Sequence, residues 1–213
     1  MPITTEVVAY VRGSLPPAPA RVLEIGAGDG RLARALIDAG YEVTAIDPAA
    51  EPGGVVEPIA LIEADGSFDA AVAIVSLHHI EPLNESISNL AGLLRAGAPL
   101  VIDELDCHRF DERAARWWLG QRQALGRDHE QPHDDHGPLT PSKMVSDLRH
   151  HVHSIATIRE ALAPTFEVGR PVPGPYMHRW HLPESLRDAE LELIATGNLS
   201  PVGCRMLAIR RSG

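Results

Sequence analysis

Apolar positions in the first half of the chain follow two alternating spacings. Short, nearly continuous apolar runs bounded by Gly, Pro or Asp are typical of strands that are covered on both faces. Between them, apolar residues recur at helical spacing, as from Leu32 to Ala39 and from Leu83 to Leu94. The predicted strands are Arg21–Ile25, Glu42–Ile46, a short strand near Val55–Ile59, Phe68–Val75 and Pro99–Glu104. This alternation predicts a parallel sheet with helices on both faces.

The pattern loosens after Glu104, where one helix, Phe110–Leu125, is followed by a polar segment that is predicted to be a loop. His150–His153 lacks the i, i+4 spacing of a metal site on a helix, and His151 and His153 would share a face if the segment were extended. A capping-box pattern at Thr157–Glu160 predicts the start of a helix. The remaining predictions are a strand over Thr165–Val172, a helix over Glu184–Thr196 and a strand over Cys204–Arg211. We therefore expect one α/β domain over residues 1–213, with residues 1–104 as its first half. A cap region of about residues 105–165 follows the fifth strand.

Length and composition exclude several classes of protein. The chain has 213 residues, of which 44% are apolar, enough for a globular core. Its net charge of -10 argues against binding to nucleic acid or to an anionic membrane. No stretch approaches the ~18 apolar residues of a membrane span. Two cysteines, Cys107 and Cys204, make no disulfide framework, so we expect a cytoplasmic protein.

A glycine-rich turn, Glu24–Gly30 with the sequence EIGAGDG, follows the first predicted strand. Glycine lets a backbone turn sharply and approach a ligand closely. A dinucleotide site would need its third glycine where Arg31 stands, and a P-loop would need a following Gly-Lys-Ser/Thr. Glu24 would oppose a phosphate and attract an ammonium group. The turn therefore predicts a ligand that carries an amino group and lacks a phosphate.

Asp47 ends the second predicted strand, where an acid accepts hydrogen bonds from two ribose hydroxyls. A ligand with a ribose, an amino group and no phosphate is S-adenosylmethionine (SAM). At these residues the sequence resembles the class I SAM-dependent methyltransferases, whose first motif is E/D-x-G-x-G-x-G. The resemblance extends from Arg21 to about Glu104 and includes Phe68–Val72, Ser76–Ile80 and Leu94–Gly97.

The resemblance implies a Rossmann-like, seven-stranded, mostly parallel sheet whose last strand is antiparallel, with SAM as the cofactor. The glycine turn would hold the methionine part and Asp47 the ribose. The acid that the family often places after the third strand is out of register here, because Glu57 comes early and Asp65 late. The expected cofactor-binding residues are Glu24, Gly26, Ala27, Gly28, Gly30, Asp47, Pro48, Ala60, Leu61 and Ser76.

The methyl acceptor determines what further chemistry the site needs. An amine needs little more than deprotonation, whereas an aliphatic hydroxyl needs a general base, a metal or both. His78 and His79 follow the fourth predicted strand, beside the expected methyl group, and imidazole is suited to act as a base near neutral pH. His79 is the first candidate base, with His78 and His153 next. The alternative is that one histidine packs and the other bonds a neighbouring loop.

Acids and histidines also gather where a divalent metal would help. Asp103 and Glu104 end the fifth strand, and Asp134 and His136 lie in the predicted loop. Carboxylates suit Mg²⁺, and mixed carboxylate and histidine sets also accept Mn²⁺ or Zn²⁺. The sequence therefore raises Mg²⁺ as a second cofactor. The alternative is a solvated acidic loop with an acid bonded to the rim of the site.

Aromatic and polar side chains in the second half suit a sugar or a phenol, and Tyr176, His178 and Trp117 are the candidate acceptor-binding residues. The composition and the histidine-rich cap resemble actinobacterial sugar O-methyltransferases, including the mannoside 1-O-methyltransferase of methylmannose polysaccharide synthesis. We therefore expect methyl transfer to a hydroxyl of a small molecule, such as a sugar, by a monomer or homodimer. The alternatives are N- or C-methylation of another metabolite and a non-catalytic SAM-binding module.

Overall fold

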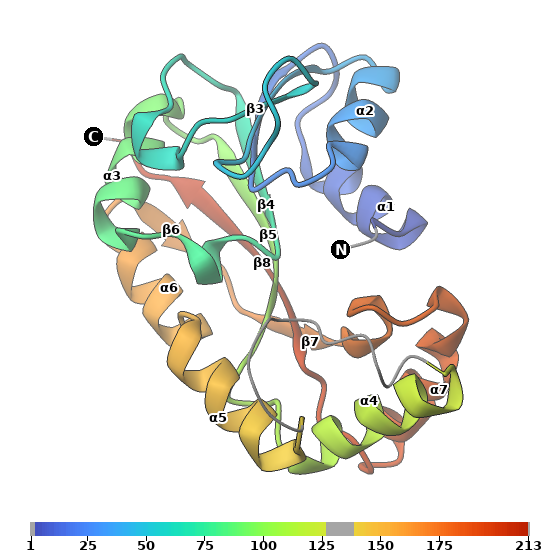
Figure 1. The fold of residues 1–213 in the computed structure, drawn as a ribbon. Helices are drawn as coiled ribbons and strands as arrows, with labels where there is room; N and C mark the ends of the chain where they lie inside the picture. The colour runs from blue at the N-terminus through green and yellow to red at the C-terminus, as the bar shows by residue number, and fades with distance from the viewer. Residues whose placement is uncertain (1–2, 127–138, 213) are drawn as a thin grey trace.

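A computed structural model describes residues 3–126 and 139–212, which fold around an eight-stranded sheet (Figure 1). The strands are β1 (Arg21–Ile25), β2 (Glu42–Ile46), β3 (Val56–Glu57), β4 (Ala70–Ile74), β5 (Pro99–Leu105), β6 (Phe166–Val168), β7 (Val172–Gly174) and β8 (Gly203–Arg210). Their order is β3-β2-β1-β4-β5-β8-β6, and β7 also pairs with β8. The first five strands are parallel, and β8 runs antiparallel to β5. The Rossmann-like, mostly parallel fold is confirmed.

Helices cover both faces of the sheet because its central strands are apolar on both sides. The helices α1 (Thr5–Ser14) and α2 (Arg31–Asp38) pack on one face, against Val22, Val72 and Val101. On the other face, α3 (Leu83–Leu93) and α6 (Ile155–Leu162) pack against Leu23, Ala71 and Ile102. Figure 1 shows these two pairs of helices on opposite sides of the strands.

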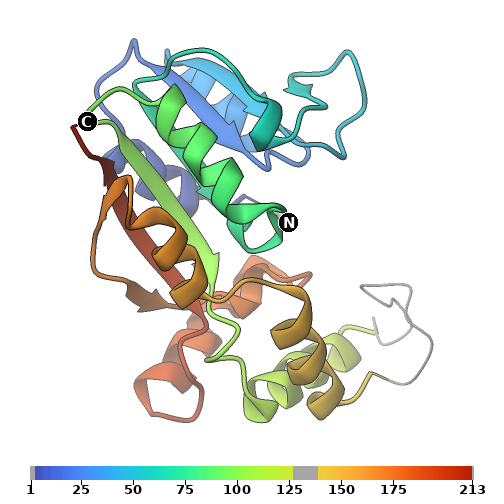
Figure 2. The ribbon, with the colours of Figure 1, turned by 90° about the vertical axis from the view of Figure 1, so that its left-hand side faces the viewer.

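A second apolar cluster forms a cap beyond the carboxyl ends of β4 and β5 (Figure 2). The cap consists of α4 (Glu112–Ala124), α5 (Pro141–His151), the 3₁₀ turns η3 (Met177–Arg179) and η4 (Glu184–Leu186), and α7 (Arg187–Ala195). Trp118, Phe110 and Met177 are at its buried centre. The cap therefore comes from two stretches of the chain, whereas the sequence predicted one, and α6 belongs to the sheet layer.

The strand count differs from the prediction, because the segment expected to form one strand over Thr165–Val172 gives two short strands. Gly169 ends β6, and Pro171 lacks the N–H that a continuous ladder needs. The chain resumes pairing with β8 as β7, which contains Pro173. The other end of the sheet is also shorter than expected, since β3 has only two residues.

The histidine-rich segment and the capping-box segment both have helical structure. His150 and His151 belong to the last turn of α5, where each Nδ1 lies near the backbone carbonyl oxygen four residues earlier. The helix α6 begins at Ile155, and its N-cap is Ser154, whose Oγ accepts a hydrogen bond from the Thr157 N–H. Thr157 therefore lies inside the helix that it was expected to begin.

Candidate functional site

The glycine turn closes against the end of β2 and the loop after β4. The N–H groups of Gly26 and Ala27 both donate to the carbonyl oxygen of Ile46, at 2.8 and 3.0 Å. Gly26 has a φ of 69°, and a Cβ built on it would lie 2.3 Å from Cβ of Ser76. Glycine is therefore required at position 26 both by the backbone conformation and by the space available.

Asp47 is bound to the same turn through its side chain. One carboxylate oxygen accepts from the Gly28 N–H and the other from the Ala49 N–H, each at 2.9 Å. These two bonds fix the direction of the carboxylate, which has further lone pairs for hydroxyl donors. Pro48 follows and limits the backbone beside it.

A cavity of about 230 Å³ opens between these elements at the carboxyl edge of the sheet. Its polar lining residues are Asp47, Ser76 and His79. Its other lining residues are Ile25, Gly26, Ile46, Pro48, Ile59, Leu61, Val75 and Ile80. Of the predicted cofactor-binding residues, Gly26, Asp47, Pro48, Leu61 and Ser76 line it. Ala27, Gly28 and Gly30 lie in the turn, and Ala60 lies between two lining residues.

Glu24 is buried in β1 beneath the turn, with 3% of its surface exposed. Among the described residues, its Oε2 has no hydrogen-bond partner. Burial raises the pKa of this carboxyl to about 8, and the charge of Asp29 contributes to the increase. Glu24 therefore holds its proton at neutral pH when no cation lies beside it.

The loop after β4 is held by a buried carboxylate on the next strand. Oε1 of Glu104 accepts from the N–H groups of Ser76 and Leu77, at 2.8 and 2.7 Å. Oε2 of the same residue lies 2.6 Å from Nδ1 of His78. These bonds shape the 3₁₀ turn η2 (Leu77–His79), which places His79 at the cavity while His78 stays buried.

Comparisons with known proteins show the family and the fold of the chain. A family model described as a methyltransferase domain matches residues 5–140, well over half of the chain. The chain belongs to this methyltransferase family. A ubiquinone biosynthesis O-methyltransferase of Xanthomonas axonopodis is 36% identical over 115 residues, and the match covers 46% of this chain and 48% of that protein. An uncharacterized methyltransferase of Mycobacterium bovis is 32% identical over 150 residues, and the match covers 65% of this chain and 59% of that protein.

The chain therefore spans about half to three fifths of the length of these curated relatives. Solved structures match it over a larger share. A SAM-dependent methyltransferase of Mesorhizobium loti has a TM-score of 0.60 and 17% identity, covering 97% of this chain and 98% of that one. A Burkholderia thailandensis N1-methyltransferase bound to S-adenosylhomocysteine (SAH) has a TM-score of 0.52 and 18% identity, covering 97% and 76%. At such identities these structures establish the SAM-dependent methyltransferase fold.

His153, the third candidate base of the methyltransferase, has a different environment from His79. Its Nε2 lies 3.0 Å from the carbonyl oxygen of Ile80, so this nitrogen must carry a proton in order to donate to it. Oε1 of Glu81 is also 3.0 Å away, and the His153 N–H donates to the carbonyl oxygen of His78. These contacts tie the start of α6 to the turn that carries His79, which is a structural use of this side chain.

The residues that were expected to bind a metal are only partly described. Asp103 forms a two-point ion pair with Arg179 and a further bond from Arg205, and Glu104 holds the η2 turn. Two guanidinium groups beside Asp103 oppose a cation there, so this carboxylate does not fit a Mg²⁺ site. Within residues 3–126 and 139–212, no group of three His, Cys, Asp or Glu side chains is arranged to hold a metal. Asp134 and His136 lie outside the described residues.

A second turn, η3, contains the candidate acceptor-binding residue His178, and a second candidate, Tyr176, directly precedes it. The sequence did not reveal what holds this turn. Tyr176 and His178 are 1% and 2% exposed, and both bond to Glu190 of α7 through backbone N–H groups. Glu190 is fully buried. The sequence does contain a hint of this role. Glu190 stands four residues after Leu186 and three before Leu193, so it is an acid on the apolar face of the helix.

The remaining aromatic candidate, Trp117, is half-buried against the cap cluster, and its neighbour Trp118 is fully buried there. Tyr176 packs under the guanidinium of Arg179, 5.1 Å from the ring centre. Trp117, Trp118 and Tyr176 therefore do not form the open aromatic platform that a sugar needs. In the part of the chain that the structure describes, no helix is long and apolar enough to cross a membrane.

Proposed function

We propose that this chain binds SAM in the cavity beside the glycine turn and transfers its methyl group to a hydroxyl of a small molecule. The observation that supports this most is the meeting of Gly26, Asp47, Ser76 and His79 around one cavity at the ends of β1, β2 and β4. These would be a close-approach glycine, an acid for the ribose, the serine against which that glycine packs and a base, in the fold of SAM-dependent methyltransferases.

The cavity would bind the cofactor through three kinds of contact. Asp47, already oriented by Gly28 and Ala49, accepts bonds from the ribose hydroxyls. The apolar side chains of Ile59 and Leu61 cover the adenine. The glycine turn receives the methionine part, where an ammonium group close to Glu24 would favour loss of the Glu24 proton.

His79 would act as the general base. SAM supplies an activated methyl group, so the protein needs mainly to align the acceptor and to remove its proton. As the acceptor oxygen forms its bond to the methyl carbon, the carbon–sulfur bond breaks and His79 takes the hydroxyl proton. SAH and the methyl ether leave, and the imidazolium returns its proton to water.

A hydroxyl acceptor is favoured by the O-methyltransferase relative from Xanthomonas, which is 36% identical over 115 residues. Sugars are included among the hydroxyl compounds to be tested. The burial of Tyr176 and Trp118 gives no reason to prefer a sugar over other hydroxyl compounds. Mg²⁺ has no part in this proposal because Asp103 and Glu104 are engaged by protein groups.

The test is transfer of radiolabelled methyl from SAM to a panel of phenols, sugars, aliphatic alcohols and amines. We expect turnover with a hydroxyl compound and a fall on the order of 10²-fold or more for His79→Ala. His150→Ala, which alters an exposed histidine of α5, is the matched control and should keep full activity. SAH binding without turnover of any compound would favour a non-catalytic module, and turnover of amines alone would overturn O-methylation.

A further inference from the structure

Two turns at the carboxyl edge of the sheet are built in the same way. Glu104 receives the N–H groups of Ser76 and Leu77 on one oxygen and faces Nδ1 of His78 with the other. Glu190 receives the N–H groups of Tyr176 and Met177 on Oε1, at 2.7 and 2.9 Å. Its Oε2 accepts from the His178 N–H and lies 2.7 Å from Nδ1 of the same residue. Each turn is thus a 3₁₀ segment anchored by one buried carboxylate and carrying one buried histidine.

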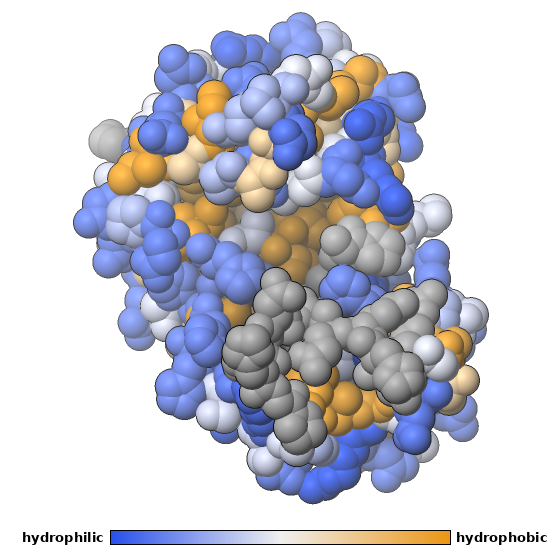
Figure 3. All heavy atoms as spheres, viewed as in Figure 1, coloured by the Kyte–Doolittle hydropathy of each residue, from blue (hydrophilic) through white to orange (hydrophobic). Residues whose placement is uncertain are grey.

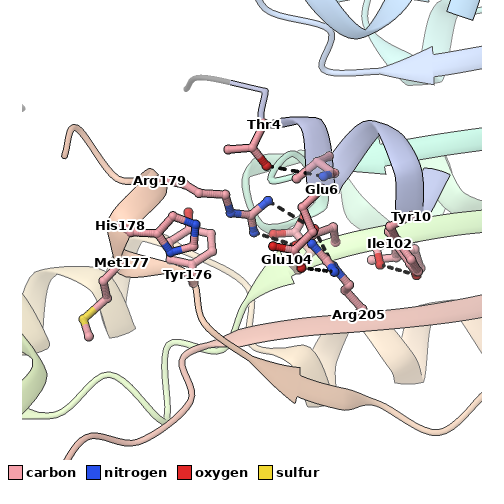
Figure 4. A network of polar contacts seen from close by, with 12 residues as sticks. Thr4, Glu6, Tyr10, Ile102, Glu104, Tyr176, Met177, His178, Arg179 and Arg205 are labelled. Carbon is pink, nitrogen blue, oxygen red and sulfur yellow. Dashed lines mark hydrogen bonds and ion pairs between the residues drawn. The ribbon is translucent and has the colours of Figure 1, made fainter. Parts of the chain in front are cut away.

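The second turn lies next to the cofactor cavity across the end of β5. Val75 lines the cavity and also packs against the cluster that contains Tyr176 and Met177. The backbone carbonyl oxygen of Asp103 accepts a hydrogen bond from the Val75 N–H. The carboxylate of the same residue accepts two hydrogen bonds from the Arg179 guanidinium. Figure 4 shows Arg179 reaching from η3 toward the residues of β5 and β8, with His178 beside Tyr176.

The second turn has two buried polar atoms for which the described residues supply no partner. They are Nε2 of His178 and Nε of Arg179. An unpaired buried polar atom destabilises the folded state, so native proteins seldom keep one without a use. Figure 3 shows a hollow between the sheet layer and the cap, with apolar side chains at its back.

We propose that the Tyr176–Arg179 turn is the binding wall for the methyl acceptor, where Nε2 of His178 accepts a hydrogen bond from a hydroxyl of that acceptor. This inference rests on the proposed methyl transfer. The ionised carboxylate of Glu190 accepts a hydrogen bond from Nδ1 of His178, so the proton of the neutral imidazole lies on Nδ1. Nε2 of His178 then has a lone pair that can accept a hydrogen bond. Nε of Arg179 supplies a donor for an oxygen of the same molecule.

The charges around the turn restrict the class of acceptor. Asp103 neutralises Arg179, and Glu104 and Glu190 add two buried carboxylates nearby. The guanidinium of this turn, Arg179, is already paired with Asp103, so among the described residues of the turn a carboxylate or phosphate meets no unpaired cation. Such an anion also has no proton to donate to His178. A neutral compound with a hydroxyl supplies both the donor and the acceptor that the two atoms need.

The experiment compares His178→Gln, Glu190→Gln and Glu104→Gln with the unaltered protein. We expect His178→Gln and Glu190→Gln to raise the KM of the hydroxyl acceptor about tenfold while the Kd of SAH stays the same. Glu104→Gln, which changes the turn beside the cofactor, should instead weaken SAH and lower kcat. His150→Gln is the exposed control. An unchanged KM in His178→Gln, with the parent enzyme active, overturns the acceptor wall and leaves the proposed function intact.

A second measurement needs no turnover. In protein labelled with ¹⁵N-histidine, with the His178 signals assigned from His178→Gln, we expect the tautomer with the proton on Nδ1. Phenol and methyl mannoside, each added with SAH, are the probes, and at least one should shift the Nε2 resonance. A proton on Nε2 in the neutral ring, or no shift with either probe, contradicts the inference. Absence of turnover with every acceptor would instead refute the proposed function.

Discussion

Oε2 of Glu104 lies 2.6 Å from Nδ1 of His78, and both side chains are buried. Glu104 thereby connects β5 to the turn that carries His79. The Glu104 carboxylate accepts hydrogen bonds from three donors. Replacing it by Gln removes the charge and turns an amide NH₂ group, itself a donor, toward at least one of those donors. We expect Glu104→Gln to lower the free energy of unfolding by about 2 kcal/mol in urea titrations. Glu85→Gln, an exposed acid of α3, is the control, and equal stability of the two variants would show that the pair is unimportant.

The glycine turn gives a prediction with its own internal control. A Cβ at position 26 meets Ser76 at 2.3 Å, whereas a Cβ at position 28 meets nothing within 4 Å, and both residues have positive φ. Gly28→Ala should cost about 1 kcal/mol of stability, since only the backbone is strained. Gly26→Ala should cost more and should also abolish SAH binding measured by calorimetry. Similar affinities for the two variants would refute the close packing of Gly26 on Ser76.

Glu24 makes the stability of the protein depend on pH. Its pKa rises from 4.5 to about 8 on folding, chiefly through burial, so the folded state binds the extra proton between these values. The contribution is therefore complete below pH 4.5 and is lost as the pH rises toward 8. We expect Glu24→Gln to gain stability relative to the parent between pH 5.5 and pH 8.5 in urea titrations. Parallel pH profiles would indicate a normal carboxyl.

Metal removal should leave methyl transfer unchanged. Asp103 is paired with Arg179 and Arg205, and Glu104 is bonded to η2, so neither has a vacant site for a cation. Turnover after EDTA treatment, measured against an untreated sample, should therefore be the same. Loss of activity with EDTA and its recovery with Mg²⁺ would mean that acids elsewhere bind a metal that the reaction needs.

The first half of the fold could be predicted because its determinants are local in the sequence. The glycine turn, Asp47 and the Ser76–His79 segment each follow a buried strand, and parallel strands bring their carboxyl ends together. The two-residue β3 and the division of the last predicted edge strand into two were not predicted. The pairing of β6 and β7 depends on β8, which lies much later in the chain, whereas β3 pairs with its near neighbour β2.

The acceptor side of the site was harder to predict because its contacts join residues that are far apart. Asp103 stands in a position that suits a metal ligand, but its partners, Arg179 and Arg205, follow 76 and 102 residues later. Glu6 of α1 bonds Arg205 and Arg187, which links α1 to β8 and α7. No spacing in the sequence indicates such pairs. The apolar spacing of Met144 and Leu148 carries α5 through His151, so His151 and His153 are not on one face of an extended segment.

The measurement that tests the central claim most directly is titration calorimetry of SAH with the unaltered protein, Asp47→Ala and Asp38→Ala. Asp47 lines the cavity, whereas Asp38 is an exposed acid at the far end of α2. We predict that SAH binds the parent and Asp38→Ala equally and binds Asp47→Ala at least about tenfold more weakly, a loss of about 1.4 kcal/mol. No heat of binding with the parent, or equal affinity of all three proteins, would contradict the assignment of this cavity to the cofactor.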